Sequence, residues 1–145
     1  MDLDLDLDLV VNTVVVAVVS VDAPRVPRLP KTGMFGFHRL DAYKAAIRFL
    51  GVASKLVTKI PRGNADLRDQ LRRAALSVPL NIAEGSGKFS RDAVRFYAIA
   101  RGSALECAAI LDALETMSVL DEAALKDARE LLERVVSMLT GLIRP

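Results

Sequence analysis

With 145 residues, of which 52% are hydrophobic and 5% aromatic, the chain is long enough for one domain with a buried core. Alanine, leucine and valine supply the apolar content, as is typical of packed helices, and the single cysteine, Cys107, excludes an intramolecular disulfide and favours a reducing, cytoplasmic location. The formal net charge of +2 conceals an asymmetry. Residues 34–101 hold 13 basic and 5 acidic residues, a net of +8, whereas residues 102–145 hold 4 and 8, a net of −4. This segregation indicates a polyanionic partner, head-to-tail self-association, or both.

The first 33 residues differ from the rest of the chain. Their Asp–Leu alternation and the β-branched run that follows predict a strand, but no later segment offers a partner strand. The apolar run over residues 9–21 is too short to cross a bilayer, and the acidic start does not fit a secretory signal, so no membrane segment is expected. We expect translation to start at Met34, with residues 1–33 an upstream extension. A real but poorly ordered tail is the alternative.

The remaining residues, 34–145, predict one all-α domain. Apolar residues recur with helical spacing over four segments, at about residues 40–60, 65–84, 90–116 and 121–143. Ser90 and Asp121 are the expected N-caps of the last two helices. The turns between the segments are short, which predicts an up-down-up-down four-helix bundle.

The second helix contains a proline and ends at a glycine pair. Apolar spacing continues through Pro79, so a single helix kinked at the proline is expected rather than two helices. Gly85 and Gly87 are expected to end it, because glycine readily adopts the left-handed conformation that reverses a chain.

Basic residues gather on one stripe of the first helix. Lys44, Arg48, Lys55 and Lys59 fall within about 60° of one another, and we expect no acidic residue among them. In the second helix Asp69 is expected to pair with Arg73, which leaves Arg68 and Arg72 as a further basic patch. The rest of the first helix is so widely apolar that cover from another subunit is expected.

A weaker phosphate site is expected at the start of the third helix. Lys88 and Arg91 flank its N-terminus, where free backbone amides attract anions. The sequence Gly85-Ser86-Gly87-Lys88 is not a phosphate-binding loop of the strand–helix kind, since its glycines are too close together and a helix precedes it. The candidate nucleic-acid-binding residues are therefore Lys44, Arg48, Lys55, Lys59, Arg68, Arg72, Lys88 and Arg91.

Five polar residues of the second and third helices belong to one candidate group: Asn81, Glu84, Arg101, Ser103 and Glu106. Because adjacent helices run antiparallel, these side chains are expected to form a structural hydrogen-bond network, with Arg101 bridging Glu84 or Glu106. A catalytic carboxylate pair is the alternative, but no base is positioned beside it.

Few residues are suited to catalysis. His38 is the only histidine and precedes the first helix, and Cys107 lies among apolar residues, as a core residue would. The sequence therefore predicts a protein that is not an enzyme, with no cofactor and no metal site.

Two motifs in the right order resemble a known family. Ala75-x-Ser77-Val78-Pro79-x-Asn81-Ile82-Ala83-Glu84-Gly85, followed by Phe96-x-x-x-Ala100-Arg101-Gly102-Ser103-x-x-Glu106, is similar to the four-helix bundle family encoded in intervening sequences of bacterial 23S ribosomal RNA genes. The opening from Phe37 to Lys44 is also similar. The resemblance covers about residues 35–145. It implies a ring, commonly a pentamer, with no known enzymatic activity and an association with nucleic acid. A related branch, the accessory protein of diversity-generating retroelements, binds a reverse transcriptase and RNA.

Two functions remain open. The first is a cytoplasmic, homo-oligomeric, non-enzymatic bundle that binds RNA or DNA backbone through its basic half. The alternative is an interaction module that docks a protein partner, for example a reverse transcriptase, with nucleic-acid contact secondary.

Overall fold

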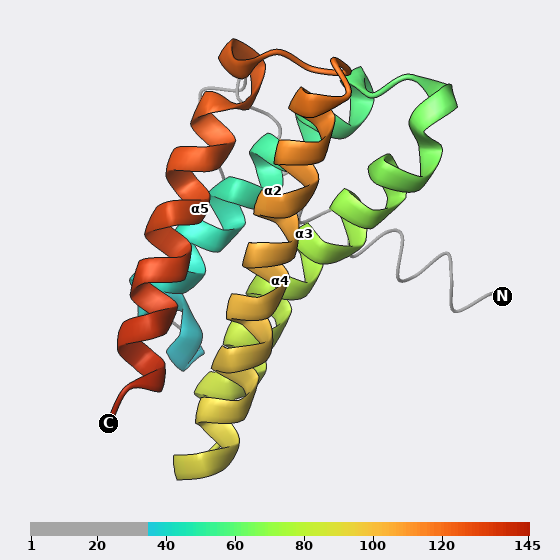
Figure 1. Ribbon diagram of the computed structural model, residues 1–145. Helices are drawn as coiled ribbons and strands as arrows, with labels where there is room; N and C mark the ends of the chain where they lie inside the picture. The colour runs from blue at the N-terminus through green and yellow to red at the C-terminus, as the bar shows by residue number, and fades with distance from the viewer. Residues whose placement is uncertain (1–34) are drawn as a thin grey trace, which may run out of the picture.

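Residues 35–145 fold into four long helices that pack side by side (Figure 1). The computed structural model describes residues 35–145, and the expectation for residues 1–33 lies outside this range. A short 3-10 turn, η1 (Gly36–Arg39), precedes α2 (Asp41–Lys59), and a second, η2 (Arg62–Asn64), leads into α3 (Ala65–Ser86). Helices α4 (Ser90–Thr116) and α5 (Glu122–Ile143) follow. No strand occurs between residues 35 and 145, so the predicted all-α fold is confirmed.

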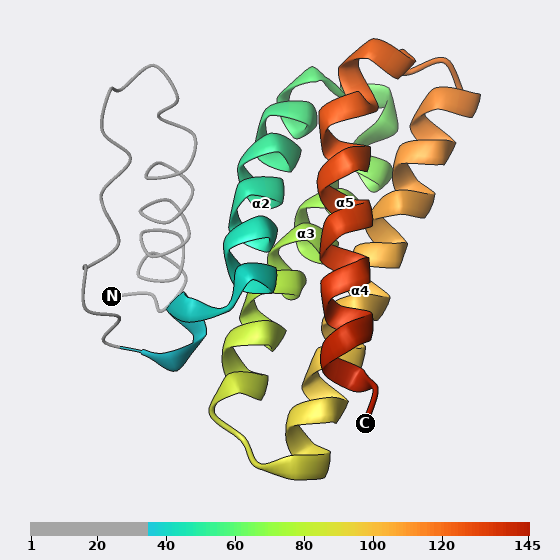
Figure 2. The same cartoon turned by 90° about the vertical axis from the view of Figure 1, so that its left-hand side faces the viewer.

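Each helix packs against two neighbours. Helix α2 contacts α3, α3 contacts α4, α4 contacts α5, and α5 closes the bundle against α2. Successive helices run in opposite directions, because the connections between them are only a few residues long. The arrangement is the expected up-down-up-down bundle, and its α3–α4 hairpin reaches beyond the start of α2 and the end of α5 (Figure 2).

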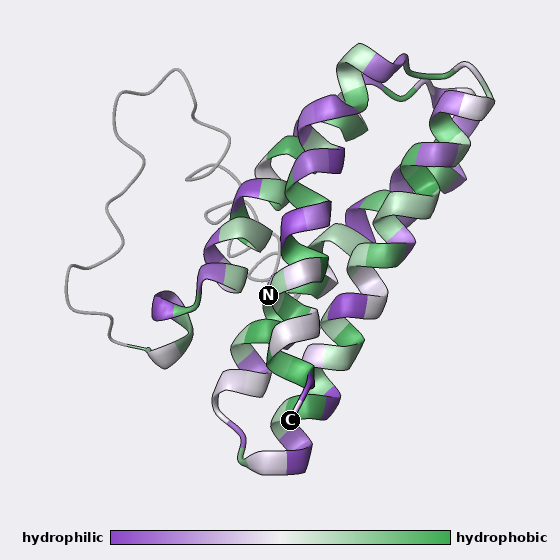
Figure 3. Cartoon of the chain, turned by 60° about the vertical axis from the view of Figure 1, so that its left-hand side comes forward, coloured by the Kyte–Doolittle hydropathy of each residue, from purple (hydrophilic) through white to green (hydrophobic). Residues whose placement is uncertain are grey.

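The core is apolar throughout. Hydrophobic and hydrophilic residues alternate along the helices (Figure 3), and the side chains that are buried are apolar. No polar or charged residue of the described chain is buried. In α5 the inward positions recur every three or four residues, as an amphipathic helix requires. They are Leu125, Ala128, Leu132, Val135 and Leu139.

Helix α3 continues through Pro79 without a break. Pro79 is buried inside the helix, and its neighbours Val78 and Ile82 are fully buried as well. Proline removes one helical hydrogen bond, but packing of this face on α2 and α4 keeps the segment helical. The prediction of one helix rather than two is confirmed.

The glycines at the end of α3 do not adopt the left-handed conformation that was expected of them. Gly87 has a φ of −92°, so no left-handed residue ends the helix, and its N–H donates to the Glu84 carbonyl over 3.1 Å. Gly85 is needed for packing instead. A Cβ at Gly85 would lie 2.8 Å from Cε1 of Tyr97 on α4. The glycine therefore permits close approach of two helices.

Of the two residues expected to be N-caps, only Asp121 caps its helix. Asp121 caps α5, since its carboxylate accepts a hydrogen bond of 2.9 Å from the backbone N–H of Ala124. Ser90 does not cap α4. It is the first helical residue, the N-cap is Phe89 without a side-chain hydrogen bond, and Ser90 has a φ of 47°. The left-handed residue of this turn is thus a serine, placed after the glycines.

Most of the apolar arc of α2 is covered within the subunit. Helices α3 and α5 and the turn η1 all pack against α2, and none of its large apolar side chains is exposed. Ile47, Val52 and Val57 nevertheless stay partly exposed, and the expected cover by a second subunit remains a prediction. Exposed large apolar side chains lie mainly on α4 and near its ends instead, at Phe89, Val94, Ile99, Leu105 and Met117.

Candidate nucleic-acid interface

The basic stripe of α2 faces outward. Lys44, Arg48, Lys55 and Lys59 are all exposed, while the opposite side of the helix packs into the core. One acid lies among them, contrary to the expectation: the Lys44 ammonium is 3.1 Å from Oδ1 of Asp41. Asp41 precedes Lys44 by three residues, which places both on one helix face, and this spacing was the signal that the sequence reading missed.

Three cations of the stripe keep their full charge available to a ligand. Within residues 35–145, no carboxylate lies within 4.0 Å of the charged nitrogens of Arg48, Lys55 or Lys59. All three are long, flexible side chains in water. They can therefore contact an anion without first breaking an ion pair.

Helix α3 adds to the basic surface less than the sequence suggested. The expected pair of Asp69 with Arg73 does not form. Instead, Asp69 lies 3.7 Å from Nε of Arg68, and Arg73 donates to Gln70 over 3.1 Å. Arg68 is half-buried, and Asp69 partly neutralises its charge. Arg72 is exposed, and no carboxylate of the described residues contacts it.

Five of the eight candidate residues lie near opposite ends of the bundle. Lys55, Lys59 and Arg68 lie near the α2–α3 connection, whereas Lys88 and Arg91 lie at the α3–α4 turn. Helix α3 separates the two ends, and its 22 residues span about 33 Å. Lys88 is 3.8 Å from Glu84 and 5.8 Å from the Phe96 ring centroid, so its charge is already shared. Of the eight candidates, Arg48, Lys55, Lys59, Arg72 and Arg91 are exposed and have no carboxylate of the described residues within 4.0 Å.

The expected polar network forms only in part. The Ser77 hydroxyl on α3 and the Ser103 hydroxyl on α4 lie 2.9 Å apart. The Asn81 amide donates to the Ser77 hydroxyl over 3.0 Å and to the Ser77 carbonyl over 2.8 Å. This small cluster ties the two helices together. The sequence reading included Asn81 and Ser103 but gave no role to Ser77.

Arg101 does not bridge Glu84 or Glu106. Its Nε donates to the Thr140 hydroxyl on α5 over 2.8 Å, and Thr140 in turn donates to the Val136 carbonyl. Glu84 lies beside Lys88, and Glu106 is exposed. Arg101 therefore connects α4 to α5 rather than α4 to α3. Nothing local in the sequence points to a partner 39 residues away.

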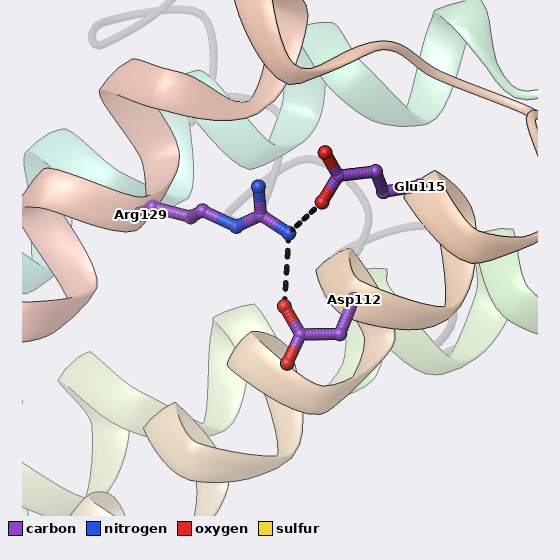
Figure 4. A network of polar contacts seen from close by, with 3 residues as sticks. All are labelled: Asp112, Glu115 and Arg129. Atoms are coloured by element: carbon purple, nitrogen blue, oxygen red, sulfur yellow. Dashed lines mark hydrogen bonds and ion pairs between the residues drawn. The ribbon is translucent and has the colours of Figure 1, made fainter.

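A second connection between α4 and α5 is ionic. The same guanidinium nitrogen of Arg129 donates to Asp112 over 2.9 Å and to Glu115 (Figure 4). The hydrogen bonds that Arg129 donates to Glu115 and then to Asp112 raise the pKa of Arg129 above its ordinary value. The sequence reading missed this pairing, because Arg129 lies 14 and 17 residues from its partners.

The residues weighed for catalysis occupy structural positions. His38 lies in an aromatic group with Phe37, whose ring centroid is 4.4 Å away, and with Tyr43. Cys107 is fully buried. Burial, followed by the charge of Glu106, raises the pKa of its thiol to about 12, so it is not a nucleophile at neutral pH. Across residues 35–145, no three His, Cys, Asp or Glu side chains gather in a metal-binding group.

Together these features define the class of protein: a small four-helix bundle with exposed cations on α2 and α3. Comparison with protein families matches residues 38–141 to the 23S rRNA-intervening sequence protein family, and the chain belongs to that family. The resemblance drawn from the two motifs is thus confirmed for this family, and the relation to the retroelement accessory branch remains an expectation. No curated protein matches the chain. Among residues 35–145, no helix has the length and apolar character needed to cross a membrane.

Proposed function

We propose that the protein is a non-enzymatic, homo-oligomeric bundle that binds the backbone of RNA or DNA through the α2–α3 surface. The observation that carries the proposal is the exposed run of Arg48, Lys55 and Lys59, which has no neutralising carboxylate within the described chain. Arg72 and the partly neutralised Lys44 and Arg68 extend the positive surface.

The chemistry of these residues favours phosphate over base recognition. Lysine and arginine neutralise phosphates and release counterions, which makes binding strong at low salt and weak at high salt. Base readout of single strands relies on aromatic stacking, and no aromatic side chain lies along this basic stripe. Binding is therefore expected to depend little on sequence.

Self-association is the second part of the proposal. The family resemblance implies a ring, commonly a pentamer, and a ring would repeat the α2 stripe once per subunit. Exposed apolar side chains on α4 support contact with other subunits, since such residues rarely gather on a monomer without a reason. The proposal places the protein in the cytoplasm, in keeping with its lone, buried cysteine.

The test is a binding titration with a fluorescently labelled RNA strand of about 20 nucleotides, repeated at 50, 100 and 200 mM salt, and again with duplex DNA. A triple variant with Arg48→Gln, Lys55→Gln and Lys59→Gln removes three charges from the stripe. Its matched control carries Lys126→Gln, Arg134→Gln and Arg144→Gln, which remove three exposed charges from the α5 region. Both triple variants have a formal net charge of 2 − 3 = −1.

The stripe variant should lose affinity, and its slope of log K against log salt should fall by about 0.7 for each lost phosphate contact with a single strand. The control should keep most of the slope. Equal losses in both variants would show that net charge alone drives binding. A wild-type chain that binds neither RNA nor DNA at 50 mM salt would disprove the proposal.

A further inference from the structure

We infer that the tip of the α3–α4 hairpin, residues 87–91, binds single-stranded nucleic acid by stacking the ring of Phe89 on an unpaired base. Lys88 and Arg91 hold the phosphates next to that base. The inference rests on the proposed function and deepens it, since the α2–α3 surface contacts the backbone alone. An aromatic ring among cations adds a preference for single strands over duplexes.

The ring of Phe89 is the most exposed large apolar side chain between residues 35 and 145, at 89%. The aromatic pairs of that range all lie at residues 35–43, so no other ring covers it. Phe89 precedes α4 and is not one of the helix residues on which self-association is proposed. A lone exposed apolar side chain is common on protein surfaces and needs no function by itself. The backbone and the charges around Phe89 set it apart.

The turn holds Phe89 in water through a strained backbone conformation. Phe89 itself is extended, with φ −110° and ψ 144°, but Ser90 has a φ of 47°. This left-handed conformation is unfavourable for serine and has no steric cost for glycine. Gly85 and Gly87 precede Ser90 by a few residues, yet neither has a positive φ. The Asp92 N–H donates to the Phe89 carbonyl over 3.2 Å, which ties the strained turn to α4. Strain of this kind persists at sites that position a functional side chain.

Cations lie before and after the ring in the chain. Arg91 and Arg95 are exposed, and no carboxylate of residues 35–145 lies within 4.0 Å of their charged nitrogens. Lys88 is 3.8 Å from Glu84, and the side chains of this pair are 44% and 53% exposed. An exposed ion pair at this distance contributes little, so a phosphate can take the place of Glu84. The hairpin tip therefore offers positive charge on both sides of an aromatic ring.

Single-stranded nucleic acid is the partner that this combination fits. Each unpaired base offers a flat face beside a phosphate, and stacking on an aromatic side chain tolerates every base. In a duplex the bases stack on one another and leave no face free for Phe89 within the helix. A membrane surface fits less well, because interfacial binding grows with the apolar area that is buried. The neighbours of Phe89 in the turn are Gly87, Lys88 and Ser90, so a membrane would bury a single ring.

One strand can reach both the hairpin tip and the α2–α3 surface. The 22 residues of α3 separate the two by about 33 Å. At about 3.4 Å per nucleotide, as in a stacked strand, this distance takes roughly ten nucleotides. A strand of about 20 nucleotides therefore contacts the cations of α2 and α3 and also the ring of Phe89. Because stacking accepts every base, binding still depends little on sequence.

The first test uses Phe89→Trp as a reporter in the full chain, because the sequence contains no other tryptophan. Stacking on a base quenches indole fluorescence. The probes are a single-stranded RNA of about 20 nucleotides, the same RNA annealed to its complement, and inorganic polyphosphate, which has the charge but no bases. Only the single strand should quench the emission strongly. Leu142→Trp on α5, at a site that is 37% exposed, is the control and should respond alike to all three probes.

The second test measures the affinity of Phe89→Ala and Phe89→Tyr for the same single strand and duplex. Phe89→Ala removes the ring and keeps every charge. Its single-strand affinity should fall by about fivefold to a hundredfold, the effect of losing one stacked base. The slope of log K against log salt should not change, because no phosphate contact is lost. Phe89→Tyr keeps a ring and should retain most of the affinity. Leu142→Ala, the matched control, removes another exposed apolar side chain and should leave both affinities unchanged.

Three results would overturn the inference: an unchanged single-strand affinity of Phe89→Ala, equal losses of its single-strand and duplex affinity, or equal quenching of Phe89→Trp by polyphosphate and RNA. A blue shift of Phe89→Trp emission on vesicles of anionic phospholipid, with no response to RNA, would also overturn it. That result would assign the hairpin tip to a membrane surface.

The stacking site and the α2–α3 surface can fail separately. A loss of affinity in the stripe variant, together with an unchanged affinity of Phe89→Ala, disproves the stacking site alone. The reverse result, a loss confined to Phe89→Ala, disproves the α2–α3 surface and supports the hairpin tip. Losses in both variants support both contacts.

Discussion

The ring of Tyr97 on α4 occupies the space that a side chain on Gly85 of α3 would need. The distance from an ideal Cβ on Gly85 to Cε1 of Tyr97 would be 2.8 Å, and to Cβ of Phe96 it would be 3.1 Å. This contact fixes the spacing of the α3–α4 hairpin near its turn. It explains the glycine better than a left-handed conformation does, because no glycine of the described chain has a positive φ.

Gly85→Ala should therefore destabilise the fold although alanine favours helix. We expect a loss of about 1–3 kcal/mol in the free energy of unfolding, since the added methyl group must displace an aromatic ring. Gly141→Ala, where the added Cβ meets nothing, should be neutral or stabilising by up to about 1 kcal/mol. Urea denaturation measures the free energy of unfolding of both variants. An equal change for the two substitutions would contradict the prediction that Gly85 is required for packing.

The hydroxyl pair of Ser77 and Ser103 should contribute to stability through coupling between α3 and α4. Ser77→Ala and Ser103→Ala should each reduce the free energy of unfolding by about 1 kcal/mol, and the double variant should lose less than the sum. Glu84→Gln is a useful comparison, because Glu84 has only an exposed contact of 3.8 Å with Lys88. Its effect should stay below about 1 kcal/mol. A larger loss for Glu84→Gln than for Ser103→Ala would show that Glu84 has a role in an assembly contact.

Stability should fall as the pH rises above about 9. The Cys107 thiol has a reference pKa of 9.0, and burial raises it to about 12 in the folded chain. Between these values the unfolded chain loses a proton that the folded chain keeps, so unfolding releases protons and becomes more favourable with increasing pH. Burial also raises the pKa of Tyr43 and Tyr97 in the folded chain, which adds to the same trend above pH 10.

Cys107→Ala removes one of these three groups. Its free energy of unfolding should therefore fall less steeply between pH 9 and 10 than that of the wild-type chain. The difference in slope should be at most about 1.4 kcal/mol per pH unit. Urea denaturation at pH 7, 9 and 10 measures it, and identical slopes for the two chains would exclude Cys107 as a source of the pH dependence.

Arg129 should contribute modestly to the packing of α5 on α4. Arg129→Gln removes two ion pairs and leaves Asp112 and Glu115 without their shared cation. Because the group is near the surface, we expect a loss of about 1 kcal/mol or less in the free energy of unfolding, decreasing in 0.5 M salt. Arg134→Gln is the control, since Arg134 is exposed and has no carboxylate of residues 35–145 within 4.0 Å. Equal, salt-independent losses would contradict an ionic contribution.

The sequence was sufficient for the helices because their signals are local. Apolar spacing defines α5 from Leu125 to Leu139, and Asp121 caps it through an N–H three residues away. Pro79 could be kept inside α3 because apolar residues on both sides of it shared one face. Periodicity is a property of neighbouring residues, so it can be recognised without knowing the fold.

The partners of the polar side chains could not be predicted in the same way. Arg101 had two carboxylates within reach in the expected register but bonds to Thr140, and that choice depends on how α4 is rotated against α5. No role was predicted for Ser77, because its hydroxyl contacts Ser103, which lies 26 residues later in the chain. The acid beside Lys44, in contrast, was visible from the i,i+3 spacing alone and should have been included. The partners of the polar side chains were therefore harder to predict than the helices that carry them.

Basic and acidic residues are unevenly distributed along the chain, which is expected to give the subunit an electric dipole moment. Four of the six cations proposed for the α2–α3 surface lie on α2 and two on α3, whereas the segment from residue 102 onward, which includes α5, carries a net charge of −4. A polyanion would attract one side of such a subunit and repel the other, which turns the subunit before contact is made. Association rates should therefore depend on ionic strength far more steeply than a net charge of +2 would suggest.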